Sequence, residues 1–267
     1  MRIERRMKKQ LRLAWVAALL FMAASIFVTA EQLLQFKRTV AFASAEPSSA
    51  RIPVLCYHSI ADNGAGNDYI VSPEAFREQM AWLHEQGYRS IDMQEFGAIL
   101  SGEEPSTGRE VLITFDDGYR NNYTAALPVL KQYGYRATEF LVTNWVGGDA
   151  YLTWDQVKEL RAAGWDIMAH TRTHPYLPLH TAKTQRDEIA GSKAAIERKL
   201  GTSVTAIAYP YGLRSEETMR IAKQSGYAYA FTFDDGWTTS EQNPYLLKRL
   251  FIAGDQTLAD FERKMKS

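Results

Sequence analysis

The run V-L-I-T-F-D-D-G at residues 111–118 indicates the fold that we expect for this chain. Its first five residues are apolar or β-branched, which is typical of a short strand buried on both faces of a parallel sheet. Two carboxylates and a glycine end this strand, and residues 123–133 then have the spacing of a helix. A buried strand that leads directly into a helix is the repeating unit of an α/β protein.

The same strand-and-helix unit recurs on both sides of this run. Further strands are expected at residues 53–58, 88–93, 137–142, 166–170, 204–209, 228–233 and 247–252. Further helices are expected at residues 72–86, 93–100, 153–164, 184–200, 215–225 and 257–265. Seven or eight such units favour a closed barrel over an open sheet, with the active site at the C-terminal ends of the strands.

Asp116 and Asp117 lie at the expected C-terminal end of the strand that begins at Val111. Two adjacent carboxylates in a dry site interact unfavourably, because each raises the pKa of the other. The conflict is relieved when one of them binds a metal ion and the other acts as a base. For D-D-G taken alone, a turn with a helix-capping aspartate is the structural alternative.

A pair of histidines lies at the end of another strand. His170 and His174 follow D-I-M-A in the run H-T-R-T-H-P at 170–175. Imidazole and carboxylate together make catalytic zinc-type sites, in which three protein ligands leave one position open. The spacing alone is also found in ordinary surface histidines, but two chemistry-bearing motifs at strand ends favour a metal site.

The run Y-P-Y-G at 209–212 ends a third strand. Its proline and glycine shape a turn that can direct a backbone N–H group inward, as an oxyanion donor requires. Turns of this composition are common, so the run gains meaning only beside the other two motifs.

In this order, T-F-D-D-G at 114–118, H-T-R-T-H-P and Y-P-Y-G resemble the first three motifs of the polysaccharide deacetylases with NodB homology, carbohydrate esterase family 4. The resemblance covers about residues 108–265. Upstream, Y-H-S-I at 57–60 is similar to the N-terminal histidine segment of the poly-β-1,6-N-acetylglucosamine deacetylase branch. The implied fold is α/β, a distorted (β/α)7 barrel, which forms a single catalytic domain at 51–267.

The resemblance also implies an activity and a role for each matching residue. The activity is hydrolysis of N-acetyl groups from an N-acetylglucosamine-containing polysaccharide, with release of acetate. Asp116 would be the general base, and Tyr211 would donate its backbone N–H group to the oxyanion. Asp117, His170 and His174 would bind one divalent metal ion. Zinc is the expected ion, and cobalt or nickel would also suit this set of ligands.

The chain departs from the family pattern at two positions. Ala208 stands where many members have an arginine that tethers the base, and Arg249 on the last strand is our candidate replacement. No histidine follows His180, so the usual leucine-x-histidine motif that supplies the general acid is absent. We expect His58 to supply this acid, because the first strand of a barrel neighbours the last and imidazole titrates near neutral pH.

T-F-D-D-G occurs a second time, at 232–236. No H-x-x-x-H run follows this copy, so we do not expect it to bind metal. Asp235 and Trp237 look like a degenerate fourth family motif. Together with Arg249, we expect them to line the substrate groove.

The N-terminus has the pattern of an export segment. Residues 1–12 contain six Lys or Arg, and the 18 residues at 13–30 contain no charge. A basic start before an apolar stretch is typical of a signal peptide, and this stretch is also just long enough to span a bilayer. We interpret 1–30 as an export signal or membrane anchor and 31–50 as a linker. The catalytic domain is then extracytoplasmic, either membrane-anchored or secreted.

Composition limits the possible partners. The 31 Lys and Arg balance the 31 Asp and Glu, and no basic stripe follows the N-terminus, which argues against a nucleic-acid partner and fits a neutral glycan. A single cysteine, Cys56, excludes an intrachain disulfide and a multi-cysteine zinc site. Phosphoryl transfer would need a phosphate-binding glycine loop that the sequence lacks.

The sequence leaves alternatives open for the substrate and for the activity. Poly-β-1,6-N-acetylglucosamine, peptidoglycan and chitin-like oligomers are the candidate polymers, in that order. Because the usual acid and tether are missing, a catalytically inactive glycan-binding barrel at the membrane is the alternative to an enzyme.

Overall fold

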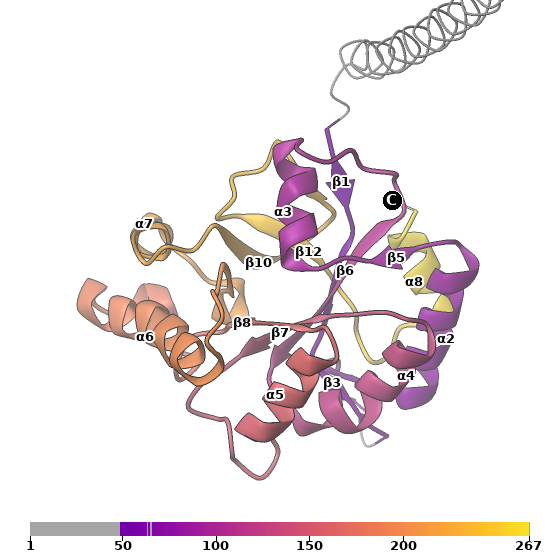
Figure 1. Ribbon diagram of the computed structural model, residues 1–267, viewed down its shortest axis with the longest axis horizontal. Coiled ribbons are helices and arrows are strands. Elements are labelled where there is room, and N and C mark those ends of the chain that lie inside the picture. Colours follow the sequence, from indigo (N-terminus) through magenta and orange to yellow (C-terminus); the bar gives the residue numbers. More distant parts are fainter. Residues whose placement is uncertain (1–48, 63, 65, 267) are drawn as a thin grey trace, which may run out of the picture. The chain divides into compact units, whose positions relative to one another are not determined.

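Seven parallel strands close into a barrel in the computed structural model, which describes residues 49–62, 64 and 66–266 (Figure 1). Closure comes from the pairing of the first strand with the second strand of the barrel, where Val54–Tyr57 runs beside Leu112–Phe115. The eighth strand of the sheet is short and pairs only with the start of its neighbour. In spatial order the strands are β2 (Val54–Tyr57), β12 (Leu247–Phe251), β10 (Tyr229–Asp235), β9 (Ala206–Ala208), β8 (Asp166–Ala169), β7 (Thr138–Leu141), β6 (Glu110–Asp117) and the edge strand β5 (Arg89–Ser90).

Strand β6 contains the run that predicted this fold. All eight of its residues are buried, and it lies between β2 and β7. The barrel is distorted on the other side, where β8 and β9 share a single register pair, Ala169 with Ile207. The predicted (β/α)7 barrel is therefore confirmed.

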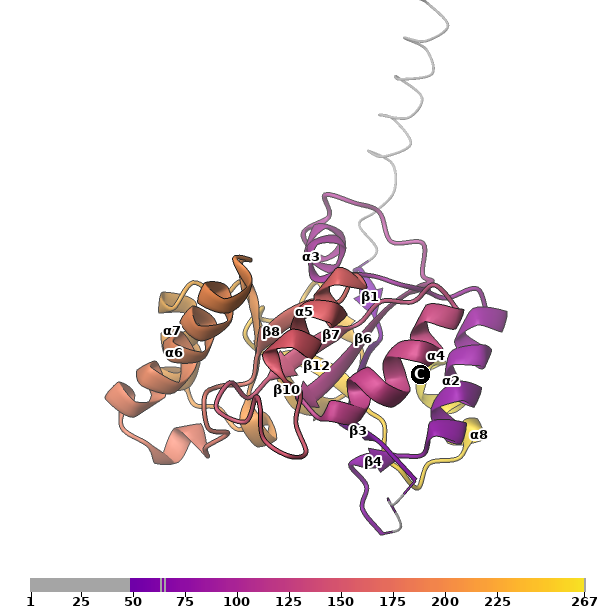
Figure 2. The same cartoon turned by 60° about the horizontal axis from the view of Figure 1, so that its bottom comes forward.

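Helices cover the outside of the barrel. Figures 1 and 2 show α2, α4 and α8 on one side and α6 and α7 on the other. The predicted caps are present: Ser72 accepts a hydrogen bond from the Ala75 N–H group, and Thr153 and Gln156 form a capping box. The helices are α2 (Pro73–Glu85), α3 (Met93–Ser101), α4 (Leu127–Gln132), α5 (Trp154–Ala162), α6 (Ala182–Leu200), α7 (Glu216–Gln224) and α8 (Leu258–Lys264).

Two predicted elements differ in the structure. The strand expected at 88–93 is reduced to β5, because Asp92 instead caps α3. The helix expected at 123–133 begins as a π-helix, η1 (Asn122–Ala126), before it continues as α4. Single π-turns of this kind are frequent near functional sites.

Short elements complete the chain. Strand β1 (Arg51–Ile52) pairs antiparallel with β11 (Thr238–Thr239), and β3 (Ser59–Ile60) pairs parallel with β4 (Ile70–Val71). Two 3₁₀ turns lie after β8 and β9. The first, η2 (Leu177–Leu179), follows the H-T-R-T-H-P run, and the second, η3 (Pro210–Gly212), lies within the Y-P-Y-G run.

Aromatic side chains fill the barrel below the polar end. The ring of Phe96, from α3, lies 5.6 Å from that of Phe231, which in turn lies 5.5 Å from Phe140. All three are fully buried, and burial of each such side chain stabilises the fold by about 1.5–3 kcal/mol. The polar groups at the C-terminal ends of the strands therefore stand on a packed apolar floor.

The predicted export segment at 1–30 and nearly all of the 31–50 linker lie outside the described residues. Within the described residues, no helix has the length and hydropathy needed to cross a membrane.

Candidate active site

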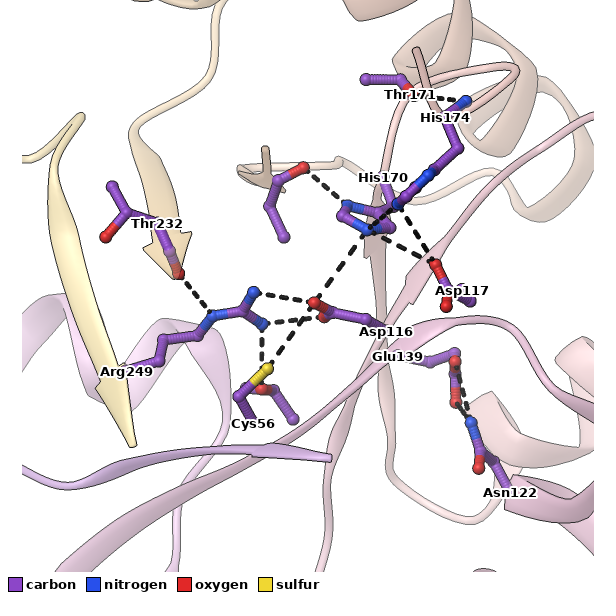
Figure 3. Close-up of polar contacts among 12 residues, drawn as sticks. Cys56, Asp116, Asp117, Asn122, Glu139, His170, Thr171, His174, Thr232 and Arg249 are labelled. Atoms are coloured by element: carbon purple, nitrogen blue, oxygen red, sulfur yellow. Dashed lines mark hydrogen bonds and ion pairs between the residues drawn. The ribbon is translucent and has the colours of Figure 1, made fainter. Parts of the chain in front are cut away.

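The D-D-G turn sends its two carboxylates in different directions. Asp117 has a φ of 75° and Gly118 a φ of 84°, so β6 ends in two consecutive left-handed residues. The positive φ explains the glycine at position 118, where a Cβ atom would also lie 2.8 Å from Leu141 Cδ2. As a result Asp116 points toward Arg249, and Asp117 points toward the two histidines (Figure 3).

The H-T-R-T-H-P turn is held from outside by Glu188 on α6. The Glu188 carboxylate accepts hydrogen bonds from the N–H groups of Arg172 and Thr173, at 2.8 and 2.9 Å, and from the Thr173 hydroxyl. Thr171 accepts a hydrogen bond from the N–H group of His174. These contacts stabilise a turn in which Thr171 and His174 both have positive φ.

Backbone strain is concentrated here. Among the residues that the structure describes, the non-glycine residues with positive φ are Asp117, Thr171, His174 and Tyr211. Each such residue costs about 1–3 kcal/mol and persists only where its surroundings enforce it, which is common at functional sites.

Three ligand atoms converge between these turns. Asp117 Oδ1 lies 3.5 Å from Nε2 of His170 and 3.5 Å from Nε2 of His174, and the two Nε2 atoms are 3.1 Å apart. Ligands placed tetrahedrally at 2.0–2.1 Å from a zinc ion would be about 3.3–3.4 Å from one another. The predicted triad therefore has the dimensions of a divalent metal site.

The protonation states agree with this interpretation. His170 Nδ1 is 2.7 Å from the carbonyl oxygen of Ala208, which leaves its Nε2 lone pair directed at the triad. Burial lowers the pKa of His170 to about 4, and burial with the neighbouring His170 lowers that of His174 to about 3. Burial and then Asp116 raise the pKa of Asp117 to about 7, and its Oδ1 accepts no hydrogen bond in the described structure. A bound cation would satisfy all three groups.

Arg249 clamps the other carboxylate. Its Nη1 and Nη2 atoms donate to Oδ1 and Oδ2 of Asp116 at 2.8 and 2.7 Å, and its Nε atom donates to the carbonyl oxygen of Thr232 (Figure 3). Burial alone would raise the pKa of Asp116, but the Arg249 guanidinium holds it well below its ordinary value. Arg249 on β12 therefore contacts Asp116 as the candidate tether, in place of the family arginine that is missing at position 208. The expectation that Arg249 lines the groove is wrong, because its side chain is 1% exposed.

His58 lies at the end of β2 beside this pair, as expected. Its ring contacts those of Tyr69, Phe233 and Phe251, with centroids 4.9–5.9 Å apart. Burial lowers the pKa of His58 to about 4, so the imidazole is neutral near pH 7. Its Nδ1 atom is buried and has no hydrogen-bond partner in the described structure.

A second set of groups also has metal-ligand spacing. Ligand atoms of Cys56, His58 and Asp116 lie within 4.8 Å of one another. However, both Asp116 oxygens already accept hydrogen bonds from Arg249, and a metal ion beside a guanidinium would be repelled. The Asp117 triad is therefore the better metal site.

The Y-P-Y-G turn places Tyr211 over the triad. Its ring lies 4.5 Å from that of His174, and its φ is 58°. Gly212 is required there, since a Cβ atom would lie 2.5 Å from the backbone nitrogen of Phe233.

Asp235 and Trp237 are not brought to this site. Asp235 lies 3.6 Å from Lys264 Nζ, and the Trp237 indole donates to the Lys264 carbonyl oxygen and stacks on Arg51. A register shift in β10 and the following antiparallel pairing of β11 with β1 lead the chain away from the strand ends. The prediction that these two residues line the groove is therefore wrong for this cavity.

A cavity of about 310 Å³ opens above the triad. A larger hollow of about 840 Å³ lies beside α3 at the N-terminal ends of β8–β10, and none of the site residues lines it. The smaller cavity is the one with converging polar groups, which distinguishes a reaction site. Besides Asp116, Asp117, His58, His170 and His174, its walls are Asn67, Tyr69, Tyr119, Trp145, Tyr209, Tyr211 and Phe233.

One supporting residue was missed from the sequence. Glu139 on β7 is fully buried and accepts hydrogen bonds from Asn122 Nδ2 at 3.3 and 3.2 Å, behind the D-D-G turn (Figure 3). Burial raises its pKa well above the ordinary value. A carboxylate inside the apolar run A-T-E-F-L-V was the available signal, because buried acids need a partner.

Comparison with known proteins agrees with this site. A family model for polysaccharide deacetylases matches residues 103–230. The chain is 37% identical over 204 residues to the polysaccharide deacetylase homologue YxkH of Bacillus subtilis, covering 76% of this chain and 72% of that protein. It is 28% identical over 204 residues to the poly-β-1,6-N-acetyl-D-glucosamine N-deacetylase of Staphylococcus epidermidis, covering 70% of each.

A solved structure extends the agreement to three dimensions. The Streptococcus pyogenes deacetylase PplD, in complex with acetate, superposes with a TM-score of 0.78 and 30% identity, covering 82% of this chain and 100% of that one. The three matching motifs, the closed barrel and these similarities lead to one conclusion. The chain belongs to the polysaccharide deacetylase family, carbohydrate esterase family 4, whose enzymes hydrolyse carbon–nitrogen amide bonds.

Proposed function

We propose that this protein removes N-acetyl groups from an N-acetylglucosamine-containing polysaccharide in a metal-dependent reaction that releases acetate. The observation that carries the proposal is the convergence of Asp117, His170 and His174 beside a separately clamped Asp116. This arrangement resolves the conflict between the adjacent carboxylates, since one faces the metal ligands and the other faces an arginine.

The triad would hold one divalent ion, for which zinc is the natural choice and cobalt or nickel are alternatives. When bound, such an ion polarises the acetyl carbonyl and lowers the pKa of water. His170 is oriented for this by Ala208, and His174 by the turn that Glu188 supports.

Asp116 would act as the general base. Its Oδ2 atom lies 4.0 Å from His170 Nε2, so it borders the space in which the attacking water must stand. Because Arg249 keeps the carboxylate ionised, it is ready to take the proton of that water as the oxygen bonds to the acetyl carbon. The backbone N–H group of Tyr211 would donate to the resulting oxyanion.

His58 would protonate the departing nitrogen. The resting imidazole is neutral, so the proton that it passes on would first come from Asp116, which has a carboxylate oxygen within 4.8 Å of one ring nitrogen of His58. When the carbon–nitrogen bond breaks, the amine leaves with this proton, and the acyl group leaves with the water oxygen and its other proton as acetic acid, which ionises to acetate in solution. The cycle returns Asp116 and His58 to their starting states.

A catalytically inactive glycan-binding barrel is less consistent with the site. A binding protein has no need of a fully buried Asp116–Arg249 ion pair, whose desolvation costs several kcal/mol per ion. The alternative predicts glycan binding without acetate release, and the assay below distinguishes the two.

The polymer and the compartment are part of the proposal. The Staphylococcus epidermidis relative is named for poly-β-1,6-N-acetyl-D-glucosamine, and this supports our choice of that polymer as the first candidate, before peptidoglycan and chitin-like oligomers. The basic and apolar N-terminal segment supports an extracytoplasmic domain, membrane-anchored or secreted. Protease added to cells without a wall should then digest the domain, whereas its protection would refute the location.

The decisive assay measures acetate released from the three polymers by the purified protein, before and after chelation and after zinc is restored. We expect release from at least one polymer, loss of activity with chelator and recovery with zinc. Full activity after exhaustive chelation would contradict the metal requirement, and binding of a polymer without acetate would favour the inactive barrel.

A further inference from the structure

The exposed large apolar side chains lie in loops, and some of them border the candidate site. In the described residues they are Tyr69, Tyr176, Leu179, Tyr211 and Leu213. Tyr69 contacts His58, and the other four lie on the turns that follow β8 and β9. Tyr69 and Tyr211 line the cavity and Tyr176 stacks on Tyr211, so these three aromatic side chains indicate a binding surface that does not include Leu179.

Two of these side chains form a stack that leads outward from the metal ligands. The Tyr211 ring meets the His174 ring edge-on at 4.5 Å and lies parallel to the Tyr176 ring at 4.2 Å, with 4° between the planes. Tyr211 lines the cavity, but Tyr176 does not. One face of the Tyr176 ring is covered by Tyr211, no other ring contact of Tyr176 occurs in the described structure, and the residue as a whole is 47% exposed.

We propose that the open face of Tyr176 is a sugar-binding subsite for the residue next to the one whose acetyl group is hydrolysed. The inference rests on the proposed function and adds a second point of contact with the polymer. Because Tyr176 lies one ring beyond the cavity wall, a pyranose stacked on it is a neighbour of the residue in the cavity. Because the stack continues from the cavity wall, it sets the direction in which the bound polysaccharide extends from the site.

The chemistry of both partners supports this assignment. A pyranose with equatorial substituents exposes its C–H bonds on a flat apolar face, and the face of an aromatic ring is slightly negative. Stacking of the two removes apolar surface from water while the hydroxyl groups remain solvated. The parallel stack on Tyr211 fixes the Tyr176 ring in advance, so little side-chain entropy is lost on binding.

A purely structural role would give a different result. If Tyr176 only supported Tyr211, its loss would disturb His174 and reduce the reaction with every substrate. A subsite for a neighbouring sugar matters only when that sugar is present. The test therefore compares an acetylated glucosamine pentamer with a small aryl acetate that carries no sugar.

The experiment measures kcat/KM on both substrates with the zinc-loaded wild type, Tyr176→Ala, Tyr176→Phe and Leu179→Ala. Leu179 is the matched control, because it is 81% exposed on the same turn but lies outside the stack. We expect Tyr176→Ala to lose roughly tenfold on the pentamer, mainly through KM, and to keep aryl acetate hydrolysis. Tyr176→Phe and Leu179→Ala should stay within about twofold of the wild type on both.

Equal losses on both substrates, or no loss on the pentamer, would overturn the subsite. Failure of the proposed function is seen separately, as absence of acetate release by the wild type. In that case calorimetric binding of the pentamer to wild type and Tyr176→Ala tests the subsite directly, and equal affinities would refute it.

Discussion

The pentapeptide T-F-D-D-G occurs twice in this barrel, and its two copies have different environments. In the copy at 114–118 both aspartates are buried, and the strand ends in a left-handed Asp117. In the copy at 232–236 Asp234 forms an ion pair with Arg214, and Asp235 is 64% exposed beside Lys264. The same residues give a candidate catalytic centre once and a surface turn once.

The neighbours of each copy explain the difference. Strand β6 is near β8, whose end supplies His170 and His174, whereas β10 has a register shift that turns its aspartates outward. Adjacent carboxylates remain ionised together only where cations or solvent compensate them. The first copy has Arg249 and the proposed metal site beside it, whereas the second has Arg214, Lys264 and exposure to solvent.

Arg249 connects the two copies. It donates through Nε to the carbonyl oxygen of Thr232 in the second copy, and through both Nη atoms to Asp116 in the first. The second copy thus takes part in the site through its backbone, which orients the arginine, and through Phe233, which lines the cavity.

The largest effect is expected from the two histidines that face Asp117 of the first copy. The double variant His170→Ala, His174→Ala should lose stoichiometric metal and all measurable acetate release, because a single carboxylate cannot retain the ion. Metal analysis after dialysis checks this. Stoichiometric zinc in a folded double variant would contradict the assigned ligands.

The next largest effect is expected from Asp116, and the equivalent aspartate of the second copy, Asp234, serves as its control. Asp116→Asn should keep the metal and lower turnover by about 10²–10⁴-fold, the usual contribution of a positioned base. Asp234→Asn, the equivalent change in the second copy, should leave turnover within about twofold. If Asp116→Asn also empties the metal site, Asp116 is a ligand and the division of roles is wrong.

His58→Gln should lower kcat by about 10²-fold, since the leaving nitrogen would lose its proton donor. Metal content and KM should stay near the wild-type values, because His58 does not belong to the triad. An unchanged kcat would mean that another group supplies the proton.

A smaller loss, about tenfold in kcat, is expected for Arg249→Lys, which keeps the charge but loses the two-pronged contact with Asp116. Arg249→Met should in addition lower the free energy of unfolding by about 3–5 kcal/mol, because Asp116 is left buried without a partner. Denaturant unfolding measures the second effect. A wild-type free energy of unfolding in Arg249→Met would show that the Arg249–Asp116 ion pair does not stabilise the barrel.

Local patterns in the sequence predicted the barrel and the triad, because buried strands, caps and strand-end motifs are all short-range signals. Arg249 could be named only as a candidate, since its contact with Asp116 depends on the closure of the barrel through β12 and β2. The Tyr176–Tyr211 stack joins two turns, and no spacing along the chain predicts it. Trp237 and Asp235 were misplaced because motif matching does not detect a register shift.

The most direct test of the whole account is anomalous diffraction at the zinc edge from crystals of the zinc-loaded protein. The account predicts one strong peak about 2.0–2.2 Å from Asp117, His170 and His174, and none beside Asp234 or Asp235. A principal peak between Cys56, His58 and Asp116, or one at the second copy, would contradict the assignment of the metal to the first.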